Sequence, residues 1–375
     1  MRVLHLHSSF NAGGKELRCA KLINAFGPGI EHDIVSAIPD AMGAQVAISP
    51  RAKVNYPTDF PSLQGKPLPR RIERIAKAMA GYDLVLTYNW GAMDAVMAHT
   101  LLGPRMGLPP LVHHEDGFNA DEAVKLKTSR NWYRRLALAH AEALVVPSRQ
   151  LEDIALTAWA QPRGKVHRIA NGIQTSDYGR KAKRDALPRV IKHDEELWLG
   201  TIAGLRPVKN LPRLVRAFSH LPDNWQLVIL GEGPEREVIL KEAMALDVGY
   251  RVHMPGFVAD PAKVIGLFDL FALSSDSEQF PISVVEAMAA GLAVVSTDVG
   301  DVAQMVSEAN RSYVIPKDRE SDYVDALEVL ALDPVARRKL GQANRIRARA
   351  EFDEASMVAA YRLVYAKAMN RERFG

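Results

Sequence analysis

Cysteine and long apolar runs are the scarcest features of this sequence. One cysteine, Cys19, among 375 residues excludes an internal disulfide and is typical of a reducing compartment, so we predict a cytoplasmic protein. No apolar run approaches the roughly 20 residues that span a bilayer. The segment Met1–His7 is too short and too polar for a secretion signal and instead predicts a first strand.

Two common ligand-binding patterns are also missing. The glycine fingerprint Gly-x-Gly-x-x-Gly does not occur, which disfavours an NAD-dependent oxidoreductase. No Asp-x-Asp pair occurs either, and the nearest approach to one is Asp276-Ser277-Glu278. We therefore expect no metal ion and no cofactor, and we do not expect nucleic acid as a partner.

The composition is that of a globular protein with two domains. Hydrophobic residues make up 47% and charged residues 25% of the chain, and 375 residues suffice for two cores. Residues 1–178 contain 21 Lys and Arg against 16 Asp and Glu, a net +5, which leaves 27 against 28, or −1, for residues 179–375. A basic N-terminal half suits an anionic membrane surface or acceptor. Scattered, solvated charges are the alternative.

A basic segment at residues 125–140 raises the same question. It predicts a helix that carries several Lys and Arg side chains beside Trp132 and Tyr133. Such a helix suits peripheral contact with the inner face of a membrane. A solvated basic face above a buried aromatic stripe is the alternative.

The stretch from Ser274 to Gly291 is the centre of the sequence. The apolar run Leu267–Leu273 predicts a buried parallel strand, and a polar loop follows it. A helix is expected from about Pro281 to Gly291. This arrangement places Glu278 at the carboxyl end of a strand, where ligands bind in open α/β sheets, and Glu286 in the next helix. Two unrelated surface carboxylates are the alternative.

Two other loops have the residues of an anion site. Arg206 and Lys209 lie between the expected strand 197–202 and a helix start, where a guanidinium fork, an ammonium and helix amides suit a diphosphate. Gly13 and Gly14 lie between the first strand and a helix over about 15–26, where glycines let backbone amides approach a charge. Two solvated cations and an ordinary glycine turn are the alternatives.

A polar cluster follows the expected strand near Leu111. His113, His114, Glu115 and Asp116 have the composition of a metal site. Neighbouring strand residues point to opposite faces of a sheet, however, so the four side chains do not easily converge on one ion.

The segment Glu-Gln-Phe-Pro-Ile-Ser-Val-Val-Glu-Ala-Met-Ala-Ala-Gly, residues 278–291, resembles the Glu-x7-Glu signature of the retaining glycosyltransferases of family four. That family usually has glycine where this chain has Gln279. The resemblance implies an α/β protein of GT-B fold, with two Rossmann-like domains facing a central cleft. We expect an N-terminal, acceptor-side domain over residues 1–175, completed by a C-terminal helix at about 352–370, and a nucleotide-sugar domain over 176–351.

The resemblance also implies roles for individual residues. Arg206 and Lys209 correspond to the diphosphate clamp, Glu278 to the catalytic carboxylate and Glu286 to the ribose contact. His113 or Asp116 is expected in the position where relatives have a catalytic-site histidine, with His114 as a third candidate. Asn89 and Trp90 are acceptor-side candidates. The remaining expected donor contacts are Gly13, Gly14, Phe257, Val258, Phe280, Pro281, Ile282 and Ser283.

The implied activity is metal-independent, retaining transfer of a hexose-type sugar. The donor is expected to be a nucleotide-sugar, most plausibly a UDP-sugar, and the acceptor a glycan or a lipid-linked molecule in polysaccharide biosynthesis. A nucleotide-sugar epimerase on the same scaffold is the first alternative. A non-catalytic protein that binds nucleotide-sugars is the second, because Asp116 departs from the family pattern.

Overall fold

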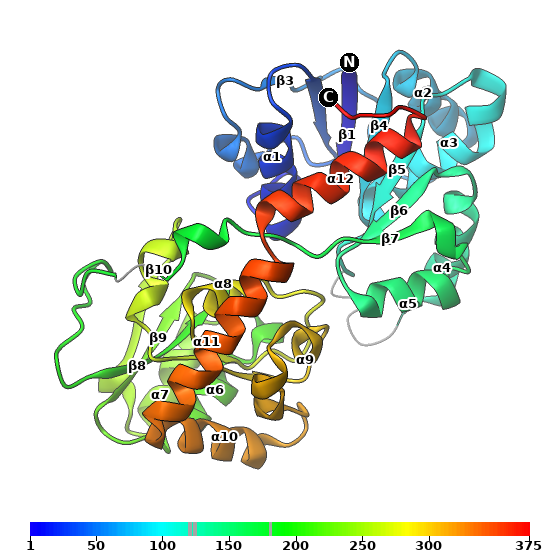
Figure 1. Ribbon diagram of the computed structural model, residues 1–375. Helices are drawn as coiled ribbons and strands as arrows, with labels where there is room; N and C mark the ends of the chain where they lie inside the picture. The colour runs from blue at the N-terminus through cyan, green and yellow to red at the C-terminus, as the bar shows by residue number, and fades with distance from the viewer. Residues whose placement is uncertain (119–121, 123–125, 180–181) are drawn as a thin grey trace. The chain divides into compact units, whose positions relative to one another are not determined.

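Two parallel β-sheets, each covered by helices, organise the chain (Figure 1). The computed structural model describes residues 1–118, 122, 126–179 and 182–375. The chain divides into two compact units: unit 1 contains residues 1–171 and 357–375, and unit 2 contains residues 172–356. The boundaries expected from the sequence lay near residues 175 and 351.

Unit 1 is built on a seven-stranded sheet whose paired strands all run parallel. The central strands of this sheet are buried on both faces, as expected for a sheet between two helical layers, whereas the edge strand Lys53–Asn55 is largely exposed. In spatial order the strands are β3 (Lys53–Asn55), β2 (Glu31–Ser36), β1 (Arg2–His7), β4 (Leu84–Tyr88), β5 (Leu111–His114), β6 (Ala143–Val146) and β7 (Val166–Arg168).

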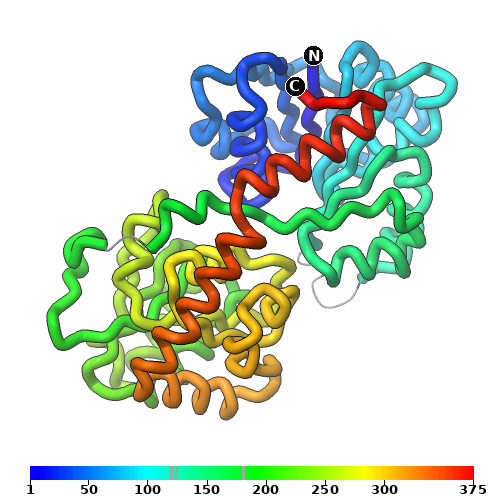
Figure 2. Tube along the Cα trace, viewed as in Figure 1, coloured from blue at the N-terminus to red at the C-terminus, as the bar shows by residue number. Residues whose placement is uncertain are grey.

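Helices cover both faces of this sheet. Side chains of α1 and α12 share one core cluster with one face of the strands, and side chains of α2, α3 and α5 share a second cluster with the other face. Figure 2 shows the two chain ends side by side in unit 1. The helices are α1 (Gly14–Phe26), α2 (Pro69–Met79), α3 (Met93–Met106), α4 (Thr128–Ala137), α5 (Arg149–Thr157) and α12 (Glu354–Ala368).

Unit 2 repeats this plan with a six-stranded parallel sheet. In spatial order its strands are β10 (Val252–Gly256), β9 (Trp225–Leu230), β8 (Leu197–Ile202), β11 (Leu270–Leu273), β12 (Val294–Thr297) and β13 (Val314–Ile315). Its helices are α6 (Leu211–Phe218), α7 (Arg236–Ala245), α8 (Ile282–Ala290), α9 (Val302–Met305), α10 (Glu320–Leu332) and α11 (Pro334–Glu351).

Each sheet has a point at which the direction of winding reverses. In unit 1 this point lies between β1 and β4, and in unit 2 it lies between β8 and β11. The loops that follow such neighbouring strands lead away to opposite sides of the sheet and leave a crevice at the carboxyl edge. The topology therefore places the candidate site of unit 2 at the loops after β8 and β11.

Most expected elements are present, with differences in length. The expected helix 281–291 is α8, and Gly291 ends it in the left-handed conformation. The strand expected over 267–273 begins only at Leu270, because residues 265–267 form a 3₁₀ turn. Residues 50–69, for which we predicted no element, contain β3. The expected helix 125–140 is α4 followed by a 3₁₀ turn, and residue 125 lies outside the described residues. Among the described helices, none combines the length and the apolar character that crossing a membrane requires.

Candidate functional site

An ion pair joins the two loops at the switch point of unit 2. Lys209 Nζ donates to Glu278 Oε1 at 2.5 Å, and the Ser275 hydroxyl donates to the same oxygen at 2.7 Å. The Lys209 and Glu278 side chains are 15% and 11% exposed. An ammonium has three donors and a carboxylate about four acceptor positions, so each group keeps capacity for a ligand. The structure thus brings together two residues that the sequence placed in separate motifs.

Further hydrogen bonds hold the same two loops in register. The Asn210 amide donates to both carboxylate oxygens of Asp276 at 3.1 Å, and the Asp276 amide donates to the Val208 carbonyl at 2.8 Å. The Ser274 hydroxyl donates to the Lys209 carbonyl at 3.0 Å. Four contacts between short segments leave the Lys209 backbone little freedom, so the ammonium starts from a fixed position. Asn210 and Asp276 were not predicted as site residues, because hydrogen bonds between distant loops have no sequence signature.

Arg206 lies on the loop after β8 and is exposed. The loop after β9 contacts the residue before Arg206: Leu205 N donates to the Glu232 carbonyl at 2.9 Å. Gly233 has a φ of +154°, and a Cβ atom there would lie 2.4 Å from the Leu205 carbonyl oxygen. The close approach explains the glycine and keeps Arg206 at the carboxyl edge, three residues before Lys209.

Glu286 lies on α8, the helix that the second loop enters. Tyr178 Oη donates to Glu286 Oε1 at 3.0 Å. Burial first, and then the negative charge of Glu286, raise the pKa of the Tyr178 phenol far above its ordinary value. The phenol therefore stays protonated and orients one oxygen of Glu286. No sequence signal pointed to Tyr178, which lies 108 residues from Glu286.

A third loop, after β12, supports the Glu278 segment. Thr297 Oγ1 donates to the Ser275 carbonyl at 2.6 Å, and the Asp301 amide donates to the Gln279 carbonyl at 3.2 Å. Gly300 has a φ of +56°, and a Cβ atom there would lie only 2.6 Å from the Gln279 carbonyl oxygen. Glycine is required at this position by both conformation and space.

The residues around the start of α8 divide into interior and partly exposed groups. The Phe280 side chain is 9% exposed and packs edge-on against Phe352, with ring centroids 5.6 Å apart. The Phe280 ring therefore belongs to the core, and the expectation that Phe280 contributes to donor binding stays a prediction. Pro281 is buried, whereas Ile282 and Ser283 are partly exposed at the first turn of α8.

Phe257 is the most exposed apolar side chain among the predicted donor contacts, with 70% of its surface accessible. It directly follows β10, and Val258 beside it is partly exposed. The Phe257 amide donates to Glu232 Oε1 at 3.4 Å, which links this segment to the loop after β9. A large apolar ring exposed to water at the carboxyl edge suits stacking with a planar ligand.

The two histidines at the end of β5 point to opposite faces of the unit 1 sheet. His113 Nδ1 lies 2.8 Å from the Thr87 hydroxyl, whereas His114 Nε2 lies 2.9 Å from the Tyr365 hydroxyl of α12. His113 is 0% and His114 1% exposed, and Glu115 is buried against Arg134 at 3.0 Å. Strand alternation thus turns both histidines into the core of unit 1, and the choice among His113, His114 and Asp116 for the catalytic-site position stays a prediction.

Asp116 remains the candidate of this cluster that is partly exposed. Arg18 of α1 binds its carboxylate with both terminal nitrogens, one contact measuring 2.8 Å, and also donates to Asn171 Oδ1 at 2.9 Å. Burial alone would raise the pKa of the Asp116 carboxyl, but the Arg18 charge outweighs it and keeps that pKa below its ordinary value. The Asp116 amide donates to Asn89 Oδ1 at 2.8 Å. Asp116 is thus a fixed carboxylate, and Arg18 is a partner that the sequence did not reveal.

The remaining candidates of unit 1 lie at the same carboxyl edge. Gly13 precedes α1 and Gly14 begins it. Trp90 follows β4, and its ring lies 4.8 Å from the guanidinium carbon of Arg130 and 4.9 Å from that of Arg134. That these residues meet a donor or an acceptor stays a prediction.

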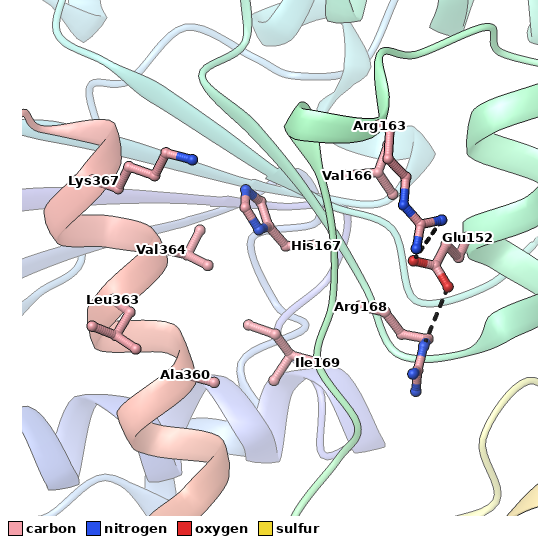
Figure 3. A pocket seen from close by; sticks show the side chains of 10 residues that line it. All are labelled: Glu152, Arg163, Val166, His167, Arg168, Ile169, Ala360, Leu363, Val364 and Lys367. Carbon is pink, nitrogen blue, oxygen red and sulfur yellow. Dashed lines mark ion pairs between the residues drawn. The ribbon is translucent and has the colours of Figure 1, made fainter.

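A groove of about 440 Å³ lies elsewhere in unit 1, between β7 and α12 (Figure 3). Its apolar wall includes Val166, Ile169 and Leu363, and its arginines, Arg163 and Arg168, both pair with Glu152 at 3.3 Å. It contains none of the predicted site residues. Because its two arginines share one carboxylate and it contains no predicted site residue, we place the candidate site at the loops of unit 2.

Two family models match successive parts of the chain. The model described as "Glycosyltransferase Family 4" matches residues 12–177, and the model described as "Glycosyl transferases group 1" matches residues 183–347. The second match includes Arg206, Lys209, Glu278 and Glu286.

Similar curated proteins cover most of the chain. The putative glycosyltransferase EpsF of Bacillus subtilis is 27% identical over 324 residues, which are 79% of each chain. A D-inositol 3-phosphate glycosyltransferase of Kribbella flavida is 23% identical over 365 residues, 89% of this chain and 86% of that protein. An N-acetyl-alpha-D-glucosaminyl L-malate synthase of Bacillus anthracis is 22% identical over 286 residues, 76% of this chain and 74% of that one.

Solved structures show the same fold. HepE of Anabaena, crystallised in complex with UDP, aligns with a TM-score of 0.79 over 98% of this chain and 100% of that one, at 18% identity. Sucrose-phosphate synthase of Thermosynechococcus elongatus aligns with a TM-score of 0.76 over 99% of this chain and 100% of that one, at 20% identity.

Proposed function

The chain belongs to family four of the glycosyltransferases and has the GT-B fold, and from that premise we propose its reaction. It transfers a hexose-type sugar from a nucleotide-sugar, preferentially a UDP-sugar, to a glycan or lipid-linked acceptor. Transfer retains the anomeric configuration and needs no metal ion. The UDP complex of the similar Anabaena protein supports the choice of nucleotide.

The contact between Lys209 and Glu278 carries this proposal. It holds a cation for the leaving diphosphate beside an anion for the sugar, on loops that four further hydrogen bonds and a third loop keep in place. Departure of a nucleoside diphosphate develops negative charge on phosphate and positive charge on the anomeric carbon. Fixed charges of the opposite sign stabilise both without reorganising during the reaction.

Each donor group has a counterpart in unit 2. The Arg206 fork and the Lys209 ammonium bind the diphosphate, and the first turn of α8, including Ser283, adds amides and a hydroxyl. Glu286, oriented by Tyr178, accepts hydrogen bonds from the ribose hydroxyls. Phe257 and Val258 contact the base.

Retention follows if the acceptor attacks from the face that the diphosphate leaves, with a donor phosphate oxygen taking the acceptor proton. This route needs no protein base at the anomeric carbon. Glu278 then stabilises the developing positive charge and binds hydroxyls of the donor sugar. In unit 1, Asp116 and Asn89 contribute polar contacts for the acceptor, and Arg18 keeps Asp116 charged.

One experiment tests the proposal against its alternatives. A thermal-shift panel of UDP-, GDP- and ADP-sugars identifies the donor, and nuclear magnetic resonance then follows that donor with and without candidate acceptors. A retaining transferase forms an α-linked product from an α-donor and leaves the donor sugar unchanged when no acceptor is present. An epimerase changes the donor alone, a binding protein changes nothing, and an inverted product refutes the mechanism.

Metal independence has its own test. Because Arg206 and Lys209 supply the positive charge that a divalent ion supplies elsewhere, we expect turnover to persist in excess EDTA. Loss of turnover in EDTA, restored by manganese, contradicts the assignment of these two residues as the diphosphate clamp.

We also propose peripheral contact with an anionic membrane through α4. Trp132 and Leu136, one turn apart, are 56% and 58% exposed, and the Arg135 guanidinium carbon lies 5.1 Å from the Trp132 ring centre. An exposed apolar pair beside a cation suits a lipid interface. Flotation with anionic vesicles, but not with neutral ones, is the expected result, and Trp132→Ala should abolish it.

A further inference from the structure

A cluster of buried ligand atoms lies in unit 1, apart from the groups proposed for sugar transfer. His5 and His7 are two residues apart on β1, so their side chains share one face of the strand. Cys19 comes from α1 and lies against that face. The three residues are 2%, 0% and 1% exposed.

The spacing of the three side chains matches that of ligands around one metal ion. One ligand atom from each residue lies within 4.8 Å of the other two. Cys19 Sγ lies 3.5 Å from His5 Nδ1. For comparison, bond lengths of about 2.3 Å to sulfur and about 2.0 Å to nitrogen place two tetrahedral zinc ligands roughly 3.6 Å apart.

His7 is the strongest indication of a ligand. Neither of its ring nitrogens has a hydrogen-bond partner, although the side chain is completely buried and stacks on Tyr88 at 3.9 Å between ring centres. A buried imidazole without partners carries the full desolvation cost of each unsatisfied polar group. A metal bond to one nitrogen would remove part of that cost.

The surroundings of His5 and Cys19 are arranged as supporting contacts. His5 Nε2 lies 2.9 Å from His32 Nδ1, so a proton on Nε2 leaves His5 Nδ1 as a lone pair facing Cys19. The Tyr88 hydroxyl lies 3.1 Å from His5 Nδ1 and 3.7 Å from Cys19 Sγ, where it can donate to a thiolate.

We propose that His5, His7 and Cys19 form a site for one soft monovalent metal ion, such as Cu(I). On binding, the Cys19 thiol releases its proton to solvent and its sulfur bonds to the ion, so that one thiolate and one monovalent cation make a neutral unit. A divalent ion would leave one uncompensated positive charge in an apolar interior, close to Arg18 and Lys15. Thiolate ligands also favour Cu(I).

Competition for Cu(I) against a chromogenic chelator under nitrogen tests the proposal on the full chain. We expect one ion per chain, and at least a tenfold weaker affinity for both Cys19→Ser and His7→Phe. Phe keeps the aromatic stacking of His7, and His220→Gln, at an exposed histidine, serves as the control with unchanged affinity. Binding that persists unchanged in Cys19→Ser overturns the assignment.

A second measurement needs no variant. Cys19 is the one thiol of the chain, so mass spectrometry reports its alkylation without ambiguity. One equivalent of Cu(I) should slow that alkylation at least tenfold, whereas one equivalent of Zn(II) should slow it less. Equal alkylation with and without Cu(I), or stronger protection by Zn(II), contradicts the proposed site.

Discussion

Replacing Lys209 by methionine removes the ammonium from the loop contact of unit 2 and keeps the length of the side chain. The substitution leaves Glu278 with the Ser275 hydroxyl as its remaining neighbour in that contact. The lysine has two roles, which are closing the two loops and neutralising the leaving diphosphate. The substitution removes both, so a control variant is needed to separate them.

The size of the stability effect follows from the burial of the pair. Exposed ion pairs contribute about 1 kcal/mol or less, whereas removing one partner of a fully buried pair costs about 3–5 kcal/mol. Exposures of 15% and 11% place this pair between those limits, and Ser275 still solvates the carboxylate, so we expect a loss of about 2 kcal/mol in the stability of unit 2. Turnover should fall further, by about 100-fold or more, because a preorganised donor to the leaving group is lost.

The pair between Lys192 and Asp269 provides a matched control. Lys192 Nζ lies 2.6 Å from Asp269 Oδ2, with exposures of 17% and 27%, and Asp269 directly precedes β11 at the amino end of the strand. Lys192→Met should lower the urea midpoint of unit 2 by a similar amount and leave turnover unchanged.

Urea unfolding and steady-state kinetics on both variants decide the question. In a double-mutant cycle, Lys209→Met and Glu278→Gln together should lose about 1 kcal/mol less stability than the sum of the single changes, since each leaves the other unpaired. Additive losses, or a fall in turnover for Lys192→Met equal to that for Lys209→Met, would refute the reasoning.

Three further outcomes are expected. Gly300→Ala should lower both the melting temperature and turnover, because a methyl group there collides with a carbonyl of the Glu278 loop. Gly291→Ala is the control: Gly291 has a φ of +84° and its nearest neighbour would lie 3.5 Å from the added Cβ, so this change should lower only the melting temperature. Phe257→Ala should leave the melting temperature unchanged and raise the KM for the donor about tenfold, consistent with about 1–3 kcal/mol of stacking on a base; an unchanged KM contradicts the base contact. Stability should also fall in acid: burial lowers the pKa of His114 to about 3 and that of His32 to about 4, so below the ordinary value of 6.5 the unfolded chain binds protons that the native chain does not. Each histidine then lowers the unfolding free energy by about 1.4 kcal/mol per pH unit between about pH 6.5 and its folded pKa, and a urea midpoint that is equal at pH 7 and pH 5 would argue against this.

Local patterns in the sequence predicted the elements that depend on neighbouring residues. Ser148 caps α5 in this way, because its hydroxyl accepts from the Leu151 amide, three residues along, at 3.1 Å. The helix ending at Gly291 is present because a left-handed residue closes it. The parallel sheets followed from short apolar runs, whose burial on both faces needs no information beyond their composition.

Contacts between distant segments were the part that the sequence could not reveal. His113 and Asp116 were equal candidates, and only the direction of each side chain, inward for His113 and toward Arg18 for Asp116, distinguishes them. The Phe280 ring packs on Phe352, 72 positions along the chain, and no local pattern links these two residues. Such choices depend on which loops meet, and topology rather than local pattern determines that.

The C-terminal residues 357–375 belong to the same unit as the first 171 residues, with all of unit 2 between them. A ribosome therefore releases a complete unit 2 while unit 1 still lacks α12, whose Tyr361 and Tyr365 fill the core of that unit. Until α12 is synthesised, one face of the first sheet has only part of its cover, which α1 supplies. A chain that ends at residue 356 should thus expose apolar side chains of unit 1, although it contains every residue of unit 2.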